Sequence, residues 1–109
     1  MIGAKVVWAD INKNTGLIDL ESVESKITER TKAIMLVDYA GMVCDLEKFQ
    51  KISKKYNIPI IEDAAHALGS KYNNKFIGNI SHYTIFSLQA IKHMTTVDGG
   101  FSLDRKSVV

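Results

Sequence analysis

The residue with the clearest chemical potential is Lys92, which follows a run of β-branched and aromatic residues and has Ile91 and Met94 close by in sequence. Apolar neighbours disfavour the charged form of a lysine, because they remove water from the ammonium. A lysine that is neutral more often is a competent nucleophile and forms Schiff bases with carbonyl compounds. The alternative is that the Lys92 ammonium extends into solvent while its stem covers apolar surface. The residues around Lys92 favour the first interpretation.

Two other polar residues follow predicted strands. The Ser87 hydroxyl, five residues before Lys92, can donate a hydrogen bond to a phosphate oxygen, or it can satisfy local backbone at the end of its strand. Asp63 follows an apolar run and precedes small residues, so its carboxylate can lie close to a flat ligand. The alternative for Asp63 is a helix cap for residues 64–68.

Two motifs carry a family resemblance. Residues 86–92 (FSLQAIK), continued by residues 95–100 (TTVDGG), and residues 61–69 (IEDAAHALG) resemble the two signatures of the DegT/StrS family. These proteins are pyridoxal-phosphate-dependent nucleotide-sugar aminotransferases of the fold-type I, aspartate aminotransferase-like class. The similarity extends from about residue 3 to residue 103, and family members are several times longer. The resemblance therefore implies that residues 1–109 are a partial cofactor-binding large domain, without the N-terminal segment and the C-terminal small domain.

The resemblance implies a role for four residues. Lys92 is expected to be catalytic and to bind pyridoxal 5'-phosphate (PLP) through a Schiff base. Asp63 is expected to keep the pyridine nitrogen protonated, which makes the ring an electron sink. Ser87 is expected to bind the phosphate, and His66 to contact the phenolic oxygen, although a lone histidine is also a common packing residue. The spacing of the histidines suggests no metal site.

Several neighbouring residues receive no functional assignment. His82 and His93 match no signature, and Thr95 and Thr96 are open between capping and site contact. The pair Gly99-Gly100 is expected to serve a turn with positive φ or a close backbone approach.

The implied reaction transfers an amino group from an amino acid, for which glutamate is expected, to a nucleotide-linked keto sugar, in a homodimer. Asp38 stands where the family more often has histidine, which leaves the substrate contacts near Tyr39 open. A PLP-dependent sugar dehydratase is an alternative within the same family, but such dehydratases carry histidine in place of Lys92, so Lys92 argues against this activity. The related cysteine desulfurases carry histidine immediately before the cofactor lysine, where this chain has Ile91. A cofactor-free, doubly wound binding module is the alternative from another class; its purified protein would be colourless, whereas the PLP enzyme is yellow.

Strands and helices alternate along the chain. Strands are predicted over residues 5–10, 33–37, 58–61, from Tyr83 to Ser87 and over 101–103, with a hairpin turn at residues 72–75. Asp19 and Asp45 are predicted to cap two helices. The apolar stripes of these helices are Leu20, Val23 and Ile27 in the first, and Leu46, Phe49, Ile52 and Tyr56 in the second.

This order predicts an α/β fold with a mainly parallel sheet and flanking helices. The continuous apolar run at residues 33–37 is typical of a strand covered on both faces. We expect the strands at 33, 58 and 83 to be consecutive neighbours, and the strand at 5–10 to have no direct pairing with residues 33–37. Asp38, Asp63 and the stretch from Ser87 to Lys92 would then meet at the carboxyl edge of the sheet, where such folds bind ligands.

The composition sets broad limits. The chain has 109 residues, a net charge of +2, 46% hydrophobic and 24% charged residues, which indicate one ordinary globular unit. Fourteen basic and twelve acidic residues are interspersed, so neither a nucleic-acid partner nor a membrane partner is expected. No apolar run reaches membrane length, and a single cysteine, Cys44, cannot form an intramolecular disulfide. A cytoplasmic location is expected.

Overall fold

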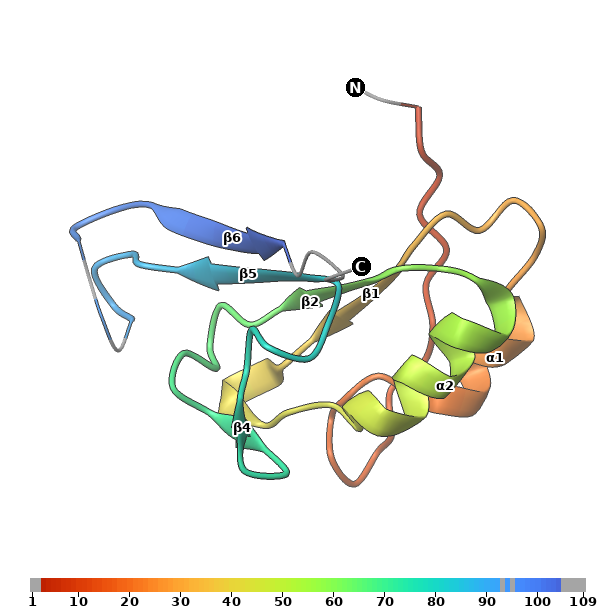
Figure 1. Cartoon of the computed structure of the whole chain (residues 1–109), viewed down its shortest axis with the longest axis horizontal. Helices are drawn as coiled ribbons and strands as arrows, with labels where there is room; N and C mark the ends of the chain where they lie inside the picture. Colours follow the sequence, from red (N-terminus) through yellow and green to blue (C-terminus); the bar gives the residue numbers. More distant parts are fainter. Residues whose placement is uncertain (1–2, 93, 95, 105–109) are drawn as a thin grey trace.

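The computed structural model describes residues 3–92, 94 and 96–104, and its centre is a four-stranded sheet (Figure 1). The strand order is β1-β2-β5-β6. The strands are β1 (Ile34–Val37), β2 (Ile60–Asp63), β5 (Tyr83–Ser87) and β6 (Gly100–Asp104). The first three are parallel and β6 is antiparallel to β5. The predicted mainly parallel α/β sheet, and the order of its three parallel strands, are confirmed.

Two helices pack against one face of this sheet. They are α1 (Leu20–Lys26) and α2 (Leu46–Tyr56), which lie beside each other in Figure 1. Both caps are as predicted: the Asp19 carboxylate accepts from the Ser22 N–H at 2.8 Å, and the Asp45 carboxylate accepts from the Lys48 N–H at 3.2 Å. Ile27 lies just beyond α1 in an extended conformation rather than inside the helix.

The side chains of the sheet alternate strictly between its two faces. Ile34, Leu36, Ile60 and Phe86 are buried on the helix side, in a core that Val23, Leu46, Phe49 and Ile52 complete. On the opposite face, Met35 is 52% exposed and Val37 is 45% exposed. The prediction that residues 33–37 are covered on both faces is therefore wrong for the described residues, because their helices cover only one face.

Residues 5–10 are not a strand, and this prediction is also wrong. Their β-branched and aromatic residues suit a strand, but Val6, Val7 and Trp8 are largely exposed and no neighbouring strand pairs with them. A strand needs a hydrogen-bonded partner strand, and among the described residues the end of this segment instead contacts α1: the Asp10 N–H donates to the Ser22 hydroxyl at 2.9 Å.

The third predicted strand is displaced by two residues. The Ile58 N–H donates to the Ser53 carbonyl at 3.0 Å, and the Ser53 hydroxyl donates to the Ile58 carbonyl at 2.6 Å. Because both backbone groups of Ile58 close the end of α2, pairing with β1 begins at the Pro59 carbonyl, which accepts from the Ile34 N–H at 3.0 Å, and continues through Asp63. This displacement brings Glu62 and Asp63 into the strand itself.

The predicted hairpin and the last strand are confirmed. The hairpin consists of β3 (Lys71–Tyr72) and β4 (Lys75–Phe76), and both turn residues have positive φ, 48° at Asn73 and 62° at Asn74. This is the conformation of a tight hairpin turn, which asparagine tolerates well. Neither helix in the described part of the chain is long and apolar enough to span a membrane.

Candidate functional site

Asp63 and Ser87 end neighbouring parallel strands on the same face of the sheet. Asp63, the last residue of β2, is in register with Ile85 of β5, and Ser87 lies two residues further along β5. The spacing of paired strands and the rise per residue place the two Cα atoms about 8 Å apart. Their face is the one that α1 and α2 leave open. An acid and a hydroxyl therefore stand side by side at the carboxyl edge.

Backbone contacts hold Asp63 in place. Its carbonyl accepts from the Asp38 N–H at 3.0 Å, and its Oδ1 accepts from the Ala65 N–H at 3.1 Å. Residues 64–68 form turns rather than the helix that Asp63 would cap, so the helix-cap alternative is wrong and the carboxylate caps a turn. Within the described part of the chain, Oδ2 accepts no hydrogen bond and is available to a ligand.

Lys92 lies on the segment that leaves β5 and returns as β6. Two backbone hydrogen bonds close the base of this segment: Leu88 N–H to Gly99 O at 2.9 Å, and Thr96 N–H to Leu88 O at 3.1 Å. Lys92 is half-buried and, among the described residues, forms no ion pair. The segment therefore holds a lysine just beyond Ser87 that has no counter-ion in the described part of the chain.

The apolar surroundings predicted for Lys92 are not present in the described structure. Ile91 is 83% exposed and Met94 is 65% exposed, because they lie on a projecting loop rather than within the sheet. Thr96 donates from its hydroxyl to the Asp98 carbonyl at 2.8 Å, which is a local turn contact. His93 and Thr95 lie outside the described residues.

The glycine pair has the structural role that its sequence predicts. Gly99 has φ of 120°, and a Cβ at Gly100 would lie 2.6 Å from the Phe86 carbonyl oxygen. Such a contact is too short for any side chain, and the obstructing atom is backbone. Gly100 therefore permits the close approach of β6 to β5.

We expect Gly100→Ala to lower the free energy of unfolding by about 1–3 kcal/mol, the usual cost of overpacking. Thermal unfolding of the intact protein, followed by circular dichroism, measures this loss. Ser102→Ala, an exposed position on the same strand, is the control and should change little. Equal stability of the two variants would contradict the close approach.

His66 lies on the turn that follows β2 and contacts Tyr39. The two rings meet edge to face, with centroids 6.0 Å apart and an interplanar angle of 61°. Tyr39 begins a short 3-10 turn, η1 (Tyr39–Gly41), directly after β1. A Cβ at Gly41 would lie 3.3 Å from the His66 carbonyl oxygen, so the two turns pack closely. Both rings are exposed and can contact a ligand at this edge.

Two buried carboxyl groups lie behind the site, and one of them escaped sequence reasoning. Asp38 and Glu62 are both completely buried on the helix side of the sheet. The Cys44 N–H donates to Asp38 Oδ1 at 3.0 Å, and the Thr84 hydroxyl donates to Glu62 Oε2 at 3.2 Å. The alternation of strand residues contains the missing signal: if Asp63 faces the open side, Glu62 must face the helices.

Burial dominates the protonation of these two groups. Removal from water, then the hydrogen bond with Asp38, raises the pKa of Glu62 to about 8. Burial likewise raises the pKa of Asp38 above its usual range. Burial and the neighbouring Asp38 raise the pKa of the Cys44 thiol to about 12, so this cysteine is a neutral, unreactive thiol at physiological pH. At pH 7 the Glu62 carboxyl is therefore mainly protonated.

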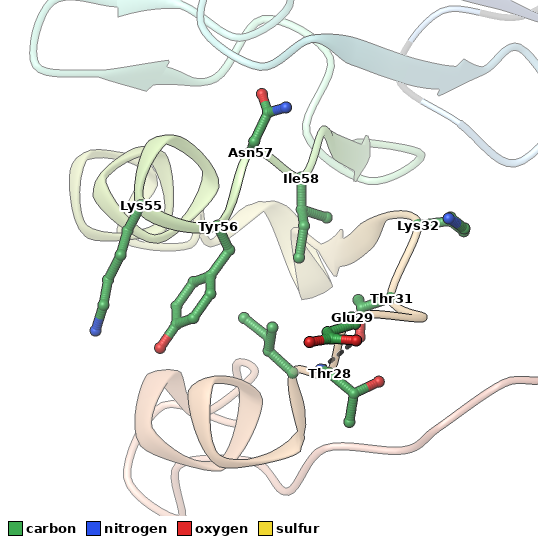
Figure 2. Close-up of a pocket in the computed structure, with 9 residues that line it drawn as sticks. Thr28, Glu29, Thr31, Lys32, Lys55, Tyr56, Asn57 and Ile58 are labelled. Atoms are coloured by element: carbon green, nitrogen blue, oxygen red, sulfur yellow. Dashed lines mark hydrogen bonds between the residues drawn. The ribbon is translucent and has the colours of Figure 1, made fainter.

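A hollow of about 660 Å³ lies at the opposite, amino end of the parallel strands (Figure 2). Ile58 and Lys32 are among the residues that line it. Some of its polar groups bind one another or neighbouring residues: Thr28 N–H donates to Thr31 Oγ1 at 2.9 Å, and Lys55 Nζ lies 2.7 Å from Glu24 Oε1. None of the four residues predicted to bind the cofactor lines this hollow.

Comparison with known proteins agrees with this geometry. The chain is 50% identical over 97 residues to the uncharacterized protein MJ1066 of Methanocaldococcus jannaschii, which covers 89% of this chain and 25% of that protein. It is similar in structure to Helicobacter pylori PseC, an aminotransferase involved in the biosynthesis of pseudoaminic acid, with a TM-score of 0.89 and 43% identity over 97% of this chain and 28% of that one.

A further structural relative is Spr1654 of Streptococcus pneumoniae, named as a sugar aminotransferase and solved in its PLP form. The TM-score is 0.90 and the identity 35%, over 98% of this chain and 31% of that one. The chain thus spans about a quarter to a third of the length of these relatives. The model of the DegT/DnrJ/EryC1/StrS aminotransferase family matches residues 1–106. This chain belongs to the DegT/DnrJ/EryC1/StrS aminotransferase family.

Proposed function

We propose that this chain forms the cofactor-binding part of a PLP-dependent enzyme that aminates a nucleotide-linked keto sugar. The observation that carries the proposal is the position of Asp63 and Ser87 on one open face of neighbouring strands, with Lys92 on the loop that continues from Ser87. The relatives support the substrate class: PseC is an aminotransferase of pseudoaminic acid biosynthesis, and another neighbour, DesI, was solved with its TDP-sugar product.

The donor set at this edge fits PLP. An acid suits a protonated ring nitrogen, a hydroxyl suits a phosphate oxygen, and an amine suits a carbonyl carbon. Bound PLP supplies an electron sink that stabilises negative charge on the Cα of an amino donor. Asp63 has a carboxylate oxygen without a hydrogen-bonding partner in the described residues, and Lys92 has no carboxylate partner there. Both groups are therefore available for this ligand.

Each side chain would then have one task. Asp63 would hold the proton on the ring nitrogen, and Ser87 would donate to the phosphate. Lys92 Nζ would bind the cofactor in the resting enzyme and, once displaced by the amino donor, would accept the proton from the donor's Cα. His66, held against Tyr39, would donate to the phenolic oxygen. We infer glutamate as the donor and a homodimer as the working assembly.

We further infer that the chain is one part of a larger enzyme. It spans 25–31% of its relatives, and the sheet face that bears Asp63 exposes Met35, Val37, Tyr83 and Ile85. An upstream segment and a smaller domain would cover this face and complete the site. On its own, the 109-residue chain is expected to be inactive, because its site would be incomplete. It is also expected to be poorly stable and to associate through its exposed apolar face.

Reductive labelling tests the proposed function. Borohydride treatment of the intact, PLP-loaded enzyme should fix a phosphopyridoxyl group on the peptide that contains Lys92. The reason is that reduction makes the bond between a lysine and the cofactor permanent. Peptide mass spectrometry locates the label. A label on a different lysine, or an intact protein that takes up no PLP, would contradict the proposal.

A further inference from the structure

The buried carboxyl groups of Asp38 and Glu62 lie on adjacent strands, directly behind the proposed cofactor site. Glu62 is in register with Leu36 of β1, so Asp38 lies two residues beyond that register on the same face. Both side chains have no exposed surface, and they interact with each other. Glu62 is covalently adjacent to Asp63, and Asp38 donates its N–H to the Asp63 carbonyl at 3.0 Å.

Two of the four carboxyl oxygens of the pair lack a hydrogen-bond donor among the described residues. Oδ1 of Asp38 has the Cys44 N–H as its donor, and Oε2 of Glu62 has the Thr84 hydroxyl. The other two oxygens, Asp38 Oδ2 and Glu62 Oε1, are buried without a donor in the described part of the chain. Two ionised carboxylates would repel each other and leave acceptors unpaired. A proton on one carboxyl provides the missing donor between them.

No positive charge is available to replace that proton among the described neighbours. The groups that face Glu62 are Asp38, Thr84 and the buried hydroxyl of Ser81, and Asp38 in turn lies near Cys44 and the negative Asp63. The buried side chains of α2 are Leu46, Phe49, Ile52 and Ser53. None of these groups carries a positive charge, and Ser81 can serve only one carboxyl.

We propose that Asp38 and Glu62 share a single proton and act as a positioning pair that fixes Asp63 and Tyr39 at the carboxyl edge. The shared proton joins the ends of β1 and β2 behind Asp63. Through Oδ1, Asp38 also anchors Cys44 and so closes the turn that carries Tyr39 to His66. The positioning role rests on the proposed function, whereas the shared proton does not.

The sign of the pH dependence follows from the cause of the shift. Burial raises the pKa of Glu62 from 4.5 to about 8, so the folded protein retains a proton that the unfolded chain releases. The stabilisation is fully present below about pH 4.5 and is lost progressively as the pH rises through about 8. Across this window one linked proton raises the unfolding equilibrium constant by up to about tenfold per pH unit.

The test compares the cofactor-free, intact protein with its Glu62→Gln variant between pH 5 and 9. The glutamine amide can donate to Asp38 Oδ2 but cannot titrate, so the ratio of the two unfolding constants should change by up to about tenfold per pH unit below pH 8. Glu21→Gln, an exposed position on α1, is the matched control and should keep the pH dependence of the wild type. Parallel curves for wild type and Glu62→Gln would overturn the shared proton.

A second measurement does not depend on whether the variant folds. The infrared spectrum of the folded wild-type protein at pH 6–7 should contain the carbonyl band of a protonated carboxyl, which disappears as the pH is raised above about 8. Absence of that band would also overturn the shared proton.

PLP affinity tests the positioning role separately. At pH values above 8, the dissociation constant of the wild type for PLP should increase relative to that of Glu62→Gln. The reason is that ionised Glu62 would be a second buried negative charge and would repel Asp38. A constant ratio between the two affinities would reject the positioning role. If neither protein binds PLP, the proposed function fails and the positioning role with it, while the unfolding and infrared results still decide the shared proton.

Discussion

Replacing Lys92 by alanine is expected to lower the transamination rate of the intact enzyme by at least about 10²–10⁴-fold, the range that a positioned proton-transfer group contributes. Under the proposed function, the variant would lose both the amine that binds the cofactor and the base that accepts the donor's Cα proton. Steady-state kinetics with an amino donor and a nucleotide-linked keto sugar measure the loss. Borohydride should then no longer attach the cofactor to the protein.

The matched control is Lys51→Ala. Lys51 is exposed on α2, which covers the face of the sheet opposite to Asp63 and Ser87. Its replacement should therefore leave the transamination rate and the borohydride labelling unchanged. Circular dichroism should show that both variants remain folded, since Lys92 lies on a loop outside the core. Near-normal turnover without Lys92 would refute its catalytic role.

Asp63→Asn is the second change with a large expected effect, a loss of about 10²–10³-fold in turnover, which is typical when one preorganised electrostatic partner is removed. Asparagine has nearly the same shape, and its Oδ1 can still accept from the Ala65 N–H, so the turn should be preserved. It cannot carry the negative charge that keeps a pyridine nitrogen protonated. The rate should therefore fall while the thermal unfolding midpoint changes little.

Asp104→Asn is the matched control, because it removes the same negative charge at a position away from the proposed site. Asp104 ends β6 at the exposed edge of the sheet, and Asp104→Asn should be kinetically silent. If Asp63→Asn retains near-normal turnover, Asp63 is not the partner of the ring nitrogen. If the Asp63→Asn variant unfolds, the hydrogen bond from the Ala65 N–H is more important to the turn than its 3.1 Å length suggests. Asp63→Glu then becomes the informative variant.

Local chemistry was sufficient to predict much of the fold. Asp19 and Asp45 are caps because a short carboxylate before an apolar periodic run can accept a free helix N–H, and that contact needs no distant partner. Asn73 and Asn74 marked the hairpin for a similar reason, since they tolerate positive φ. The order of β1, β2 and β5 followed from helical crossovers, which place successive parallel strands side by side.

Features that depend on distant partners were harder to predict. Residues 5–10 have strand-forming side chains, but the residues that the structure describes offer them no strand to pair with, and Met35 and Val37 are apolar but exposed. Lys92 was expected among apolar neighbours, yet Ile91 and Met94 project into solvent. The positions of Asp63 and Ser87 at the carboxyl edge could be predicted, because each residue follows or ends a predicted strand. Strand alternation places Glu62 on the helix side, but its pairing with Thr84 depends on the register of β2 and β5, which the sequence does not give.

The loop that carries Lys92 begins and ends in the same sheet, where Leu88 and Gly99 join its two ends. For such a closed loop, doubling the number of residues adds only about 0.6 kcal/mol of closure entropy. Insertions between residues 88 and 99 would therefore be tolerated by the fold at little cost, although each would move the amine. If Lys92 binds the cofactor as proposed, the length of this loop would be constrained in evolution by where its lysine must lie rather than by the stability of the sheet beneath it.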